Sequence, residues 1–211
     1  MVPGVSAQRE EILTAEPAGH RERLIAAMAA SIEEKGYRDT TVADVVRIAR
    51  TSRRNFYEHF ADREACFLAL FDATNEAMME QIAAAVHPDQ PLDEQVDRAV
   101  DAYIANVTAQ PALYRSFVRE VPGLGQAGAD RGLATLERFA GMLVGFVASG
   151  RRAQPELGLR PLAMDSAIII VGGLRELLVI ALQRGRDMSE LRVSAAETIK
   201  AILDGTLLNA G

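Results

Sequence analysis

Residues 40–60 read TTVADVVRIARTSRRNFYEHF, and they carry the clearest structural signal in the chain. Apolar side chains in its first half recur at three- and four-residue spacing, which predicts a short helix over 41–49. The inward positions of that helix are Val42, Val45, Val46 and Ala49. A second helix is predicted over 52–59, because Phe56 and Phe60 lie four residues apart and share one face. About two residues separate the helices, which is the spacing of a helix-turn-helix.

The second helix of this pair has a polar outward face once its two phenylalanines point inward. The side chains on the outward face are Arg53, Arg54, Asn55, Tyr57 and Glu58. Arginine and asparagine are well shaped to read guanine and adenine edges in the major groove. Tyr57, His59 and Arg63 suit phosphates, and Arg63 also lies in the first turn of a further predicted helix. The pattern favours a DNA-reading surface; the alternative is a surface hairpin without a DNA role.

The rest of the chain predicts helices only. One helix is predicted over 21–35, and another follows Asp62, a suitable N-terminal cap. The later helix-length stretches are 91–109, 111–120, 129–149, 162–184 and 189–208, and the loops between them are 87–91, 122–128 and 150–161. No segment keeps a period-two alternation, so we expect an all-α protein of about nine helices. The G-x-G-x-x-G at 123–128 follows a predicted helix and not a strand, which indicates a flexible loop and no nucleotide site.

Three parts are expected along the chain. Residues 1–19 contain Pro and Gly without useful periodicity and are predicted to be a mobile tail. A helix-turn-helix domain is predicted over 20–66, and a larger helical body over 67–211. The body is expected to hold a ligand and to form a dimer.

Composition and charge narrow the class of protein. The 211 residues are 49% apolar, with one cysteine and no suitable signal peptide or membrane span, so we expect a cytoplasmic protein. The net charge is −6, yet residues 47–63 hold five arginines against two acidic residues. This basic spot on an acidic chain fits an aimed phosphate contact. Three scattered histidines give no metal spacing, no cofactor is expected, and no catalytic set supports an enzyme.

The segments 40–49 and 52–60, followed by Asp62-Arg63-Glu64, resemble the DNA-binding signature of the TetR/AcrR family over about residues 21–71. The resemblance implies a regulator, by default a repressor, that binds a palindromic operator as a homodimer and responds to a small-molecule effector. It implies that Thr41 and Ser52 bond phosphates and that Arg53, Arg54 and Asn55 face bases or nearby phosphates. Tyr57, His59 and Arg63 would hold the DNA backbone.

Three residues depart from the family pattern. Arg50 stands in the turn where the family often has glycine, Thr51 stands where it often has a small apolar residue, and Asn55 stands where threonine is frequent. If Arg50 takes a left-handed backbone conformation, the strain costs about 1 kcal/mol, while its side chain gains access to a phosphate. These departures leave the individual base contacts open.

The resemblance also implies a ligand pocket within the middle helices and a dimer made by the last two helices. Candidate pocket residues are Tyr103, Asn106, Tyr114, Phe117, Phe139, Met142, Phe146 and Arg175, with an apolar or amphipathic effector expected. Ordinary core packing is the alternative for each aromatic. Candidate dimer residues are Ile169, Gly172, Gly173, Leu177, Ile199, Ile202, Leu203 and Thr206. The alternatives are that these helices close the core of one chain and that the two glycines mark a kink. An all-helical enzyme and a protein-interaction module remain rival interpretations of the whole chain.

Overall fold

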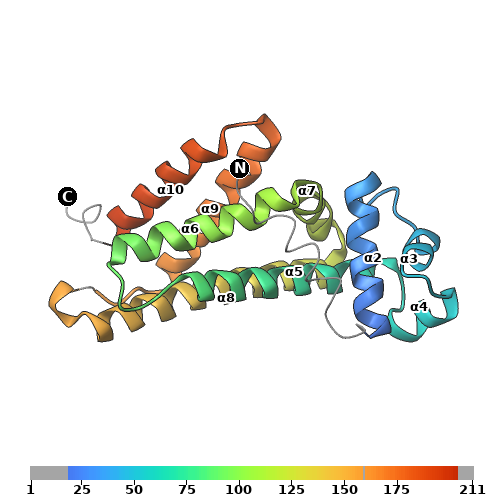
Figure 1. Ribbon diagram of the computed structural model, residues 1–211, viewed down its shortest axis with the longest axis horizontal. Coiled ribbons are helices and arrows are strands. Elements are labelled where there is room, and N and C mark those ends of the chain that lie inside the picture. The colour runs from blue at the N-terminus through green and yellow to red at the C-terminus, as the bar shows by residue number, and fades with distance from the viewer. Residues whose placement is uncertain (1–18, 159, 204–211) are drawn as a thin grey trace, which may run out of the picture. The chain divides into compact units, whose positions relative to one another are not determined.

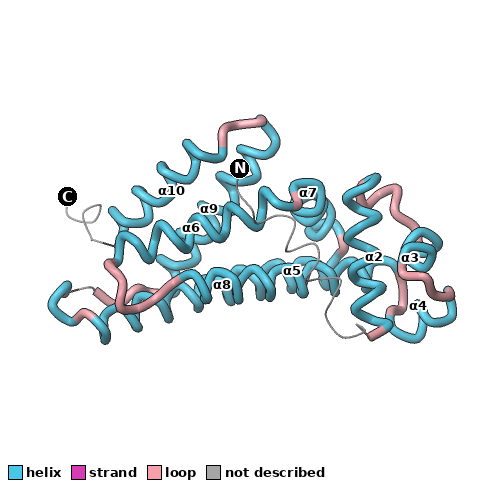
Figure 2. The backbone as a smooth tube through the Cα atoms, viewed as in Figure 1, coloured by secondary structure: helices cyan, strands magenta, loops and turns pink. Residues whose placement is uncertain are grey.

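The computed structural model describes residues 19–158 and 160–203, and all regular structure in these residues is helical (Figure 2). The all-α prediction is therefore confirmed. The predicted mobile tail lies outside the described residues except for Gly19. The chain divides into two compact units, Met1–Leu70 and Phe71–Gly211, and helix α5 contributes residues to both. The predicted domain boundary, between residues 66 and 67, lies within that same helix.

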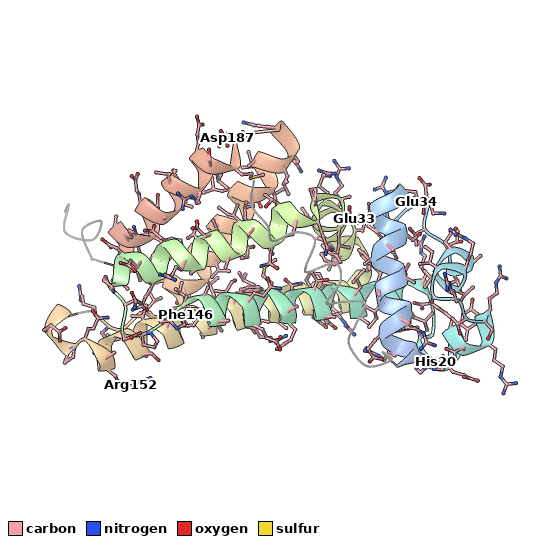
Figure 3. All side chains as sticks on the ribbon, viewed as in Figure 1. His20, Glu33, Glu34, Phe146, Arg152 and Asp187 are labelled. Atoms are coloured by element: carbon pink, nitrogen blue, oxygen red, sulfur yellow. The ribbon has the colours of Figure 1, made fainter. Side chains whose placement is uncertain are left out.

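The first unit is a small helical domain (Figure 1). Its elements are α2 (His20–Lys35), α3 (Val42–Ile48), α4 (Arg53–His59) and the start of α5 (Arg63–Ala85). Leu24, Met28, Val45, Phe56 and Phe67 are fully buried between them. Burying such side chains stabilises a fold by about 1.5–3 kcal/mol each, so this core fixes the positions of the short helices α3 and α4. Figure 3 labels His20 at the start of α2 and Glu33 and Glu34 near its end.

The start of α3 is held by a capping box. The backbone N–H of Asp44 donates to Thr41 Oγ1 at 3.3 Å, and the backbone N–H of Thr41 donates to Asp44 Oδ2 at 2.9 Å. Lys35 Nζ lies 2.7 Å from the same carboxylate. Hydrogen bonds from Lys35 and Thr41 hold the pKa of Asp44 well below its usual range. Asp44 therefore stays ionised and ties the end of α2 to the start of α3.

In the described residues, the second unit packs seven further helical segments with the rest of α5. They are α6 (Leu92–Ala109), α7 (Pro111–Glu120), the 3₁₀ turns η1 (Val121–Gly123) and η2 (Pro155–Leu157), α8 (Gly125–Ala153), α9 (Met164–Arg184) and α10 (Met188–Leu203). Helix α10 lies alongside α6 (Figure 1). Two ion pairs join these helices: Arg192 with Asp101 at 2.8 Å and Lys200 with Asp97 at 2.9 Å.

Helix α8 is longer than the sequence predicts. The prediction of a loop over 122–128 is wrong, because η1 covers its first residues and α8 begins at Gly125. Gly128 explains the difference: it is buried in α8, and a Cβ on it would lie 2.0 Å from the Val121 carbonyl oxygen. The glycine is there because the turn of η1 approaches the helix closely, and not because the chain is a loop.

By length and composition alone, α8 is also apolar enough to cross a membrane, which for a single helix in the described part of the chain is weak evidence. Two of its arginines, Arg131 and Arg138, pair with Asp72 and Glu76 of α5. These ion pairs fit a helix that packs within a bundle.

Candidate functional site

Helix α4 separates its two faces as the sequence predicts. Phe56 is fully buried and Phe60, directly after the helix, is 4% exposed, so both anchor the inward side. The Ser52 hydroxyl caps the helix by accepting the backbone N–H of Asn55 at 3.1 Å. Arg53 and Arg54 are exposed, and Tyr57, 56% exposed, is unusually open for a tyrosine. The outward side of α4 is therefore a polar, cationic surface with one aromatic ring.

The turn between α3 and α4 has the left-handed backbone conformation considered above for Arg50. Arg50 has φ 51°, which lies in the left-handed region. The backbone N–H of Thr51 donates to Val46 O at 2.9 Å and that of Arg50 to Arg47 O at 3.3 Å. This pair of bonds is a Schellman motif, whose left-handed position favours glycine. Arg50 is exposed and keeps its charge beside the start of α4.

Arg54 has an internal partner on the same helix. Its Nε donates to Glu58 Oε1 at 3.2 Å, one helical turn away, and both side chains are exposed. Exposed pairs of this kind contribute only about 0.3–0.5 kcal/mol. The arginine can therefore exchange this partner for another acceptor at small cost.

Asn55 differs from the prediction of an outward base reader. The residue is only half-exposed, and its Oδ1 is buried without a hydrogen-bond partner among the described residues. Successive helical residues are separated by about 100°, so a neighbour of the buried Phe56 lies on the flank of the helix. The sequence placed position 55 on the outward face because only Phe56 and Phe60 were assigned to the inward face.

Arg63 has a structural task that the sequence did not indicate. Its Nη1 donates to the carbonyl oxygens of Tyr37, Arg38 and Thr40 at 3.4, 3.3 and 2.9 Å. Its guanidinium carbon also lies 4.4 Å from the centre of the Tyr37 ring, which stacks on Phe67. Arg63 thus secures the segment between α2 and α3. A phosphate contact by Arg63 stays a prediction.

His59 is exposed at the end of α4, as a backbone contact requires. Its ring stacks against His20, the first residue of α2, with ring centres 6.3 Å apart. The stack places the His59 ring beside the first residue of α2.

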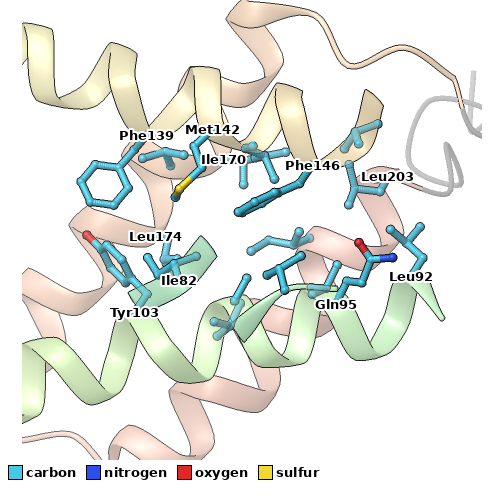
Figure 4. A pocket seen from close by; sticks show the side chains of 18 residues that line it. Ile82, Leu92, Gln95, Tyr103, Phe139, Met142, Phe146, Ile170, Leu174 and Leu203 are labelled. Carbon is cyan, nitrogen blue, oxygen red and sulfur yellow. The ribbon is translucent and has the colours of Figure 1, made fainter. Parts of the chain in front are cut away.

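The second unit contains two adjoining cavities. We call the first the apolar chamber: Tyr103 and Phe139 lie at one end and Leu92, Gln95 and Leu203 at the other (Figure 4). Helices α5, α6, α8, α9 and α10 all line it. Among the described residues that line it, only Gln95 and Tyr103 have polar side chains, and Gln95 Nε2 donates to Gln90 O at 2.8 Å outside the chamber. The chamber therefore favours an apolar ligand surface.

We call the second the polar cavity, which has a volume of about 300 Å³ against about 90 Å³ for the chamber. Its polar lining side chains are Asn75, Tyr103, Tyr114, Thr135, Arg175 and Glu176. Tyr103, Phe139 and Val171 line both cavities and so form the boundary between them. Across that boundary the Tyr103 and Tyr114 hydroxyls lie 3.3 Å apart, and burial raises the pKa of both phenols.

Most predicted pocket residues line a cavity. Met142 and Phe146 line the chamber only, whereas Tyr114, Phe117 and Arg175 line the polar cavity only. Asn106 lines neither, because its Nδ2 donates to Gln81 Oε1 at 2.9 Å and to Ala102 O at 2.8 Å. Sequence reasoning missed the aliphatic lining, including Ile82, Val96, Leu143 and Leu174. Their spacing on amphipathic helices was a signal, but one that ordinary core residues share.

The predicted dimer residues fall into two groups. On α9, Ile169 is 70% and Leu177 40% exposed, and a Cβ on Gly172 or Gly173 would meet no atom within 4 Å. On α10 the alternative holds for Ile199, which is buried in the core and lines the chamber with Leu203, and Ile202 packs against the same core. Thr206 lies outside the described residues. The exposed apolar strip is therefore on α9.

Comparisons with known proteins agree with this architecture. Residues 24–70 match the model of the family described as bacterial regulatory proteins, tetR family. No curated relative matches the chain by sequence.

Solved structures resemble most of the chain. The regulator FadR from Bacillus subtilis, in complex with stearoyl-CoA, has a TM-score of 0.70 at 16% identity, covering 87% of this chain and 98% of its own. The fatty acid degradation regulator FadR from Bacillus halodurans has a TM-score of 0.67 at 17% identity, covering 90% and 97%. A putative TetR-family regulator from Syntrophomonas wolfei has a TM-score of 0.70 at 15% identity, covering 93% and 100%. At these identities the likeness concerns the fold.

Proposed function

We propose that this chain is a transcriptional regulator of the TetR family, whose model residues 24–70 match, and that it represses transcription by binding a palindromic operator as a homodimer. A small molecule held in the second unit would release it. We place this activity in the cytoplasm and assign the chain no enzymatic reaction.

The outward face of α4 is the observation that carries the proposal. Arg53 and Arg54 are exposed on a helix that Phe56 anchors from behind. The helix is thereby presented as a rigid reading element, as a recognition helix in the major groove requires. Arginines supply the commonest bidentate contact with guanine. Tyr57 and His59 lie beside them and suit the DNA backbone.

The exposed strip of α9 supports the homodimer. Ile169 and Leu177 lie eight residues apart on one helix, with Gly172 and Gly173 between them. Eight residues correspond to about two helical turns, so the two apolar side chains share a face. The glycines leave room for a second helix to approach closely. A two-fold dimer presents two recognition helices to half-sites about 34–36 Å apart, or a multiple of that spacing.

The two cavities support a ligand-responsive regulator. FadR from Bacillus subtilis holds stearoyl-CoA in a protein of similar fold, so this architecture accommodates a small molecule. Here α5 is one continuous helix whose first residues belong to the first unit and whose remainder belongs to the second. A ligand shifts the DNA-binding equilibrium only by its different affinities for the two states, typically about 1–3 kcal/mol of coupling.

Selection from a random duplex library at near-physiological salt tests the proposal. We expect an enriched palindrome with the purified full chain and no enrichment with the variant Arg53→Ala/Arg54→Ala. The matched control is Arg119→Ala/Arg184→Ala, which removes two exposed arginines from the second unit. If the unmodified chain enriches no sequence and binds duplex only at low salt, the proposed operator recognition is wrong.

A further inference from the structure

The apolar chamber and the polar cavity share a wall. Together they are complementary to a ligand that has a narrow tail and a broad polar head. We propose that the second unit binds a single-chain anionic amphiphile. Its unbranched apolar tail lies along the chamber, and its acidic head lies in the polar cavity beside Arg175 and Tyr114. This inference rests on the proposed regulatory function and names the class of its effector.

The length of the chamber argues for a chain. Its lining on α6 extends from Leu92 to Tyr103, which is about 16 Å at a helical rise of about 1.5 Å per residue. An extended chain advances about 1.2 Å per bond, as a peptide backbone does in covering about 3.6 Å with three bonds. A length of about 16 Å corresponds to about 13 bonds, so the chamber takes a tail of about thirteen carbons.

The width of the chamber argues against rings and branches. The chamber has a volume of about 90 Å³ and a lining that extends about 16 Å along α6, whereas the polar cavity has a volume of about 300 Å³. A cavity this narrow for its length suits one extended hydrocarbon chain. It offers that chain hardly any hydrogen-bonding group, because the Gln95 amide is bonded to the loop at Gln90.

The boundary between the cavities marks where the ligand changes from apolar to polar. The Tyr103 and Phe139 rings meet edge to face there, with centres 5.9 Å apart. Tyr103 turns its hydroxyl away from the chamber's hydrocarbon lining and toward Tyr114 at 3.3 Å. A tail that enters the chamber from the polar cavity must part these rings, and the Tyr114 hydroxyl is then available to the head.

The polar cavity supplies a cation for the head. Arg175 lines the polar cavity together with other side chains that can form hydrogen bonds. It has no ion pair among the described residues. Glu176 lines the same cavity. Burial raises the pKa of Tyr103 and Tyr114, and the nearby positive charge of Arg175 acts against that rise in both. An arginine guanidinium binds a carboxylate or phosphate oxygen by charge-assisted hydrogen bonds.

Titration calorimetry of the full chain with defined probes tests the assignment. We expect dodecanoate or dodecanoyl-CoA to bind, dodecanol to bind at least about tenfold more weakly, and adamantanecarboxylate not to bind. Tight binding of dodecanoate indicates a free acid as the source of the acidic head, and preference for dodecanoyl-CoA indicates a conjugate. Equal binding of dodecanol and both acidic probes overturns the anionic head.

Two variants test the two halves of the ligand separately. Arg175→Gln should weaken the acidic probes about tenfold and leave dodecanol unchanged, whereas the control Arg184→Gln, on the same helix but outside both cavities, should change neither. Ala99→Leu places a larger side chain in the chamber about 6 Å along α6 from Tyr103. It should abolish dodecanoate binding and spare octanoate. An unchanged chain-length preference in a folded Ala99→Leu variant overturns the tail assignment.

Operator binding distinguishes this inference from the function on which it rests. If the chain enriches a palindrome but binds none of the acidic probes, the ligand assignment is wrong and the regulatory proposal stands. If the probes bind as expected but no operator is enriched, the ligand assignment stands and the regulatory proposal is wrong.

Discussion

Arg50 occupies a backbone position that favours glycine. Because its φ of 51° is strained for an L-residue, we expect Arg50→Gly to stabilise the protein by about 0.5–1 kcal/mol. Arg47→Gly is the matched control, because it removes the same side chain from the end of α3, where glycine costs about 1 kcal/mol. Denaturant unfolding measures both. If both variants lose stability equally, the left-handed turn is not a source of strain. A flatter salt dependence of DNA binding in Arg50→Gly would show that the arginine touches a phosphate.

Arg63 contacts three carbonyl oxygens in the structure, and the sequence suggested a phosphate instead. The two roles respond differently to Arg63→Lys, which keeps the charge but loses the guanidinium geometry. We expect this variant to lose about 1–3 kcal/mol of unfolding free energy, because part-buried carbonyl oxygens between α2 and α3 lose their guanidinium donor. An unchanged unfolding free energy, together with weaker DNA binding, would make the phosphate its main partner.

Glu58 lies beside Arg54 on the outward face of α4, and its negative charge would repel the phosphates of DNA. Glu58→Gln removes this charge and frees the arginine from its 3.2 Å partner, so we expect tighter operator binding. Glu34→Gln, an exposed carboxylate lost from α2, is the control and should have a smaller effect. Binding isotherms at fixed salt measure the change. If Glu58→Gln instead weakens binding only to operators that have cytosine at one position, Glu58 accepts a hydrogen bond from that base.

Helix α8 contains a glycine that the sequence pattern alone assigns to a loop. Gly128→Ala should destabilise the protein by about 1–3 kcal/mol, because its Cβ would lie 2.0 Å from the backbone oxygen of Val121. Gly145→Ala in the same helix meets no atom within 4 Å and should stabilise by up to about 1 kcal/mol. Thermal unfolding compares them. Equal effects of the two substitutions would contradict the close approach of η1.

Helices with strong local signals were predictable, and features that depend on distant contacts were not. Pro111 at the first position of α7 and Gly36 after α2 mark ends that the sequence places correctly. Gly128 gives the same local signal as a loop glycine, and only its packing against Val121 reveals a helix. The inward and outward faces of α4 follow from Phe56 and Phe60, whereas the flank position of Asn55 depends on the rotation of the whole helix.

At the scale of the whole molecule, the exposed strip of α9 leads to a prediction about assembly. Ile169→Glu places a charge at the most exposed large apolar side chain of the described residues, so we expect it to weaken the homodimer and to reduce operator binding with it. Leu133→Glu is the matched control, because Leu133 is 57% exposed on a different helix, α8. Sedimentation equilibrium measures the association, and thermal unfolding confirms that both variants fold. If the Ile169→Glu variant stays dimeric and the Leu133→Glu variant dissociates, the dimer interface is on α8 and not on α9. A monomer that still binds the full palindrome with unchanged affinity would separate operator recognition from dimerisation, which two-fold reading of a palindrome does not allow.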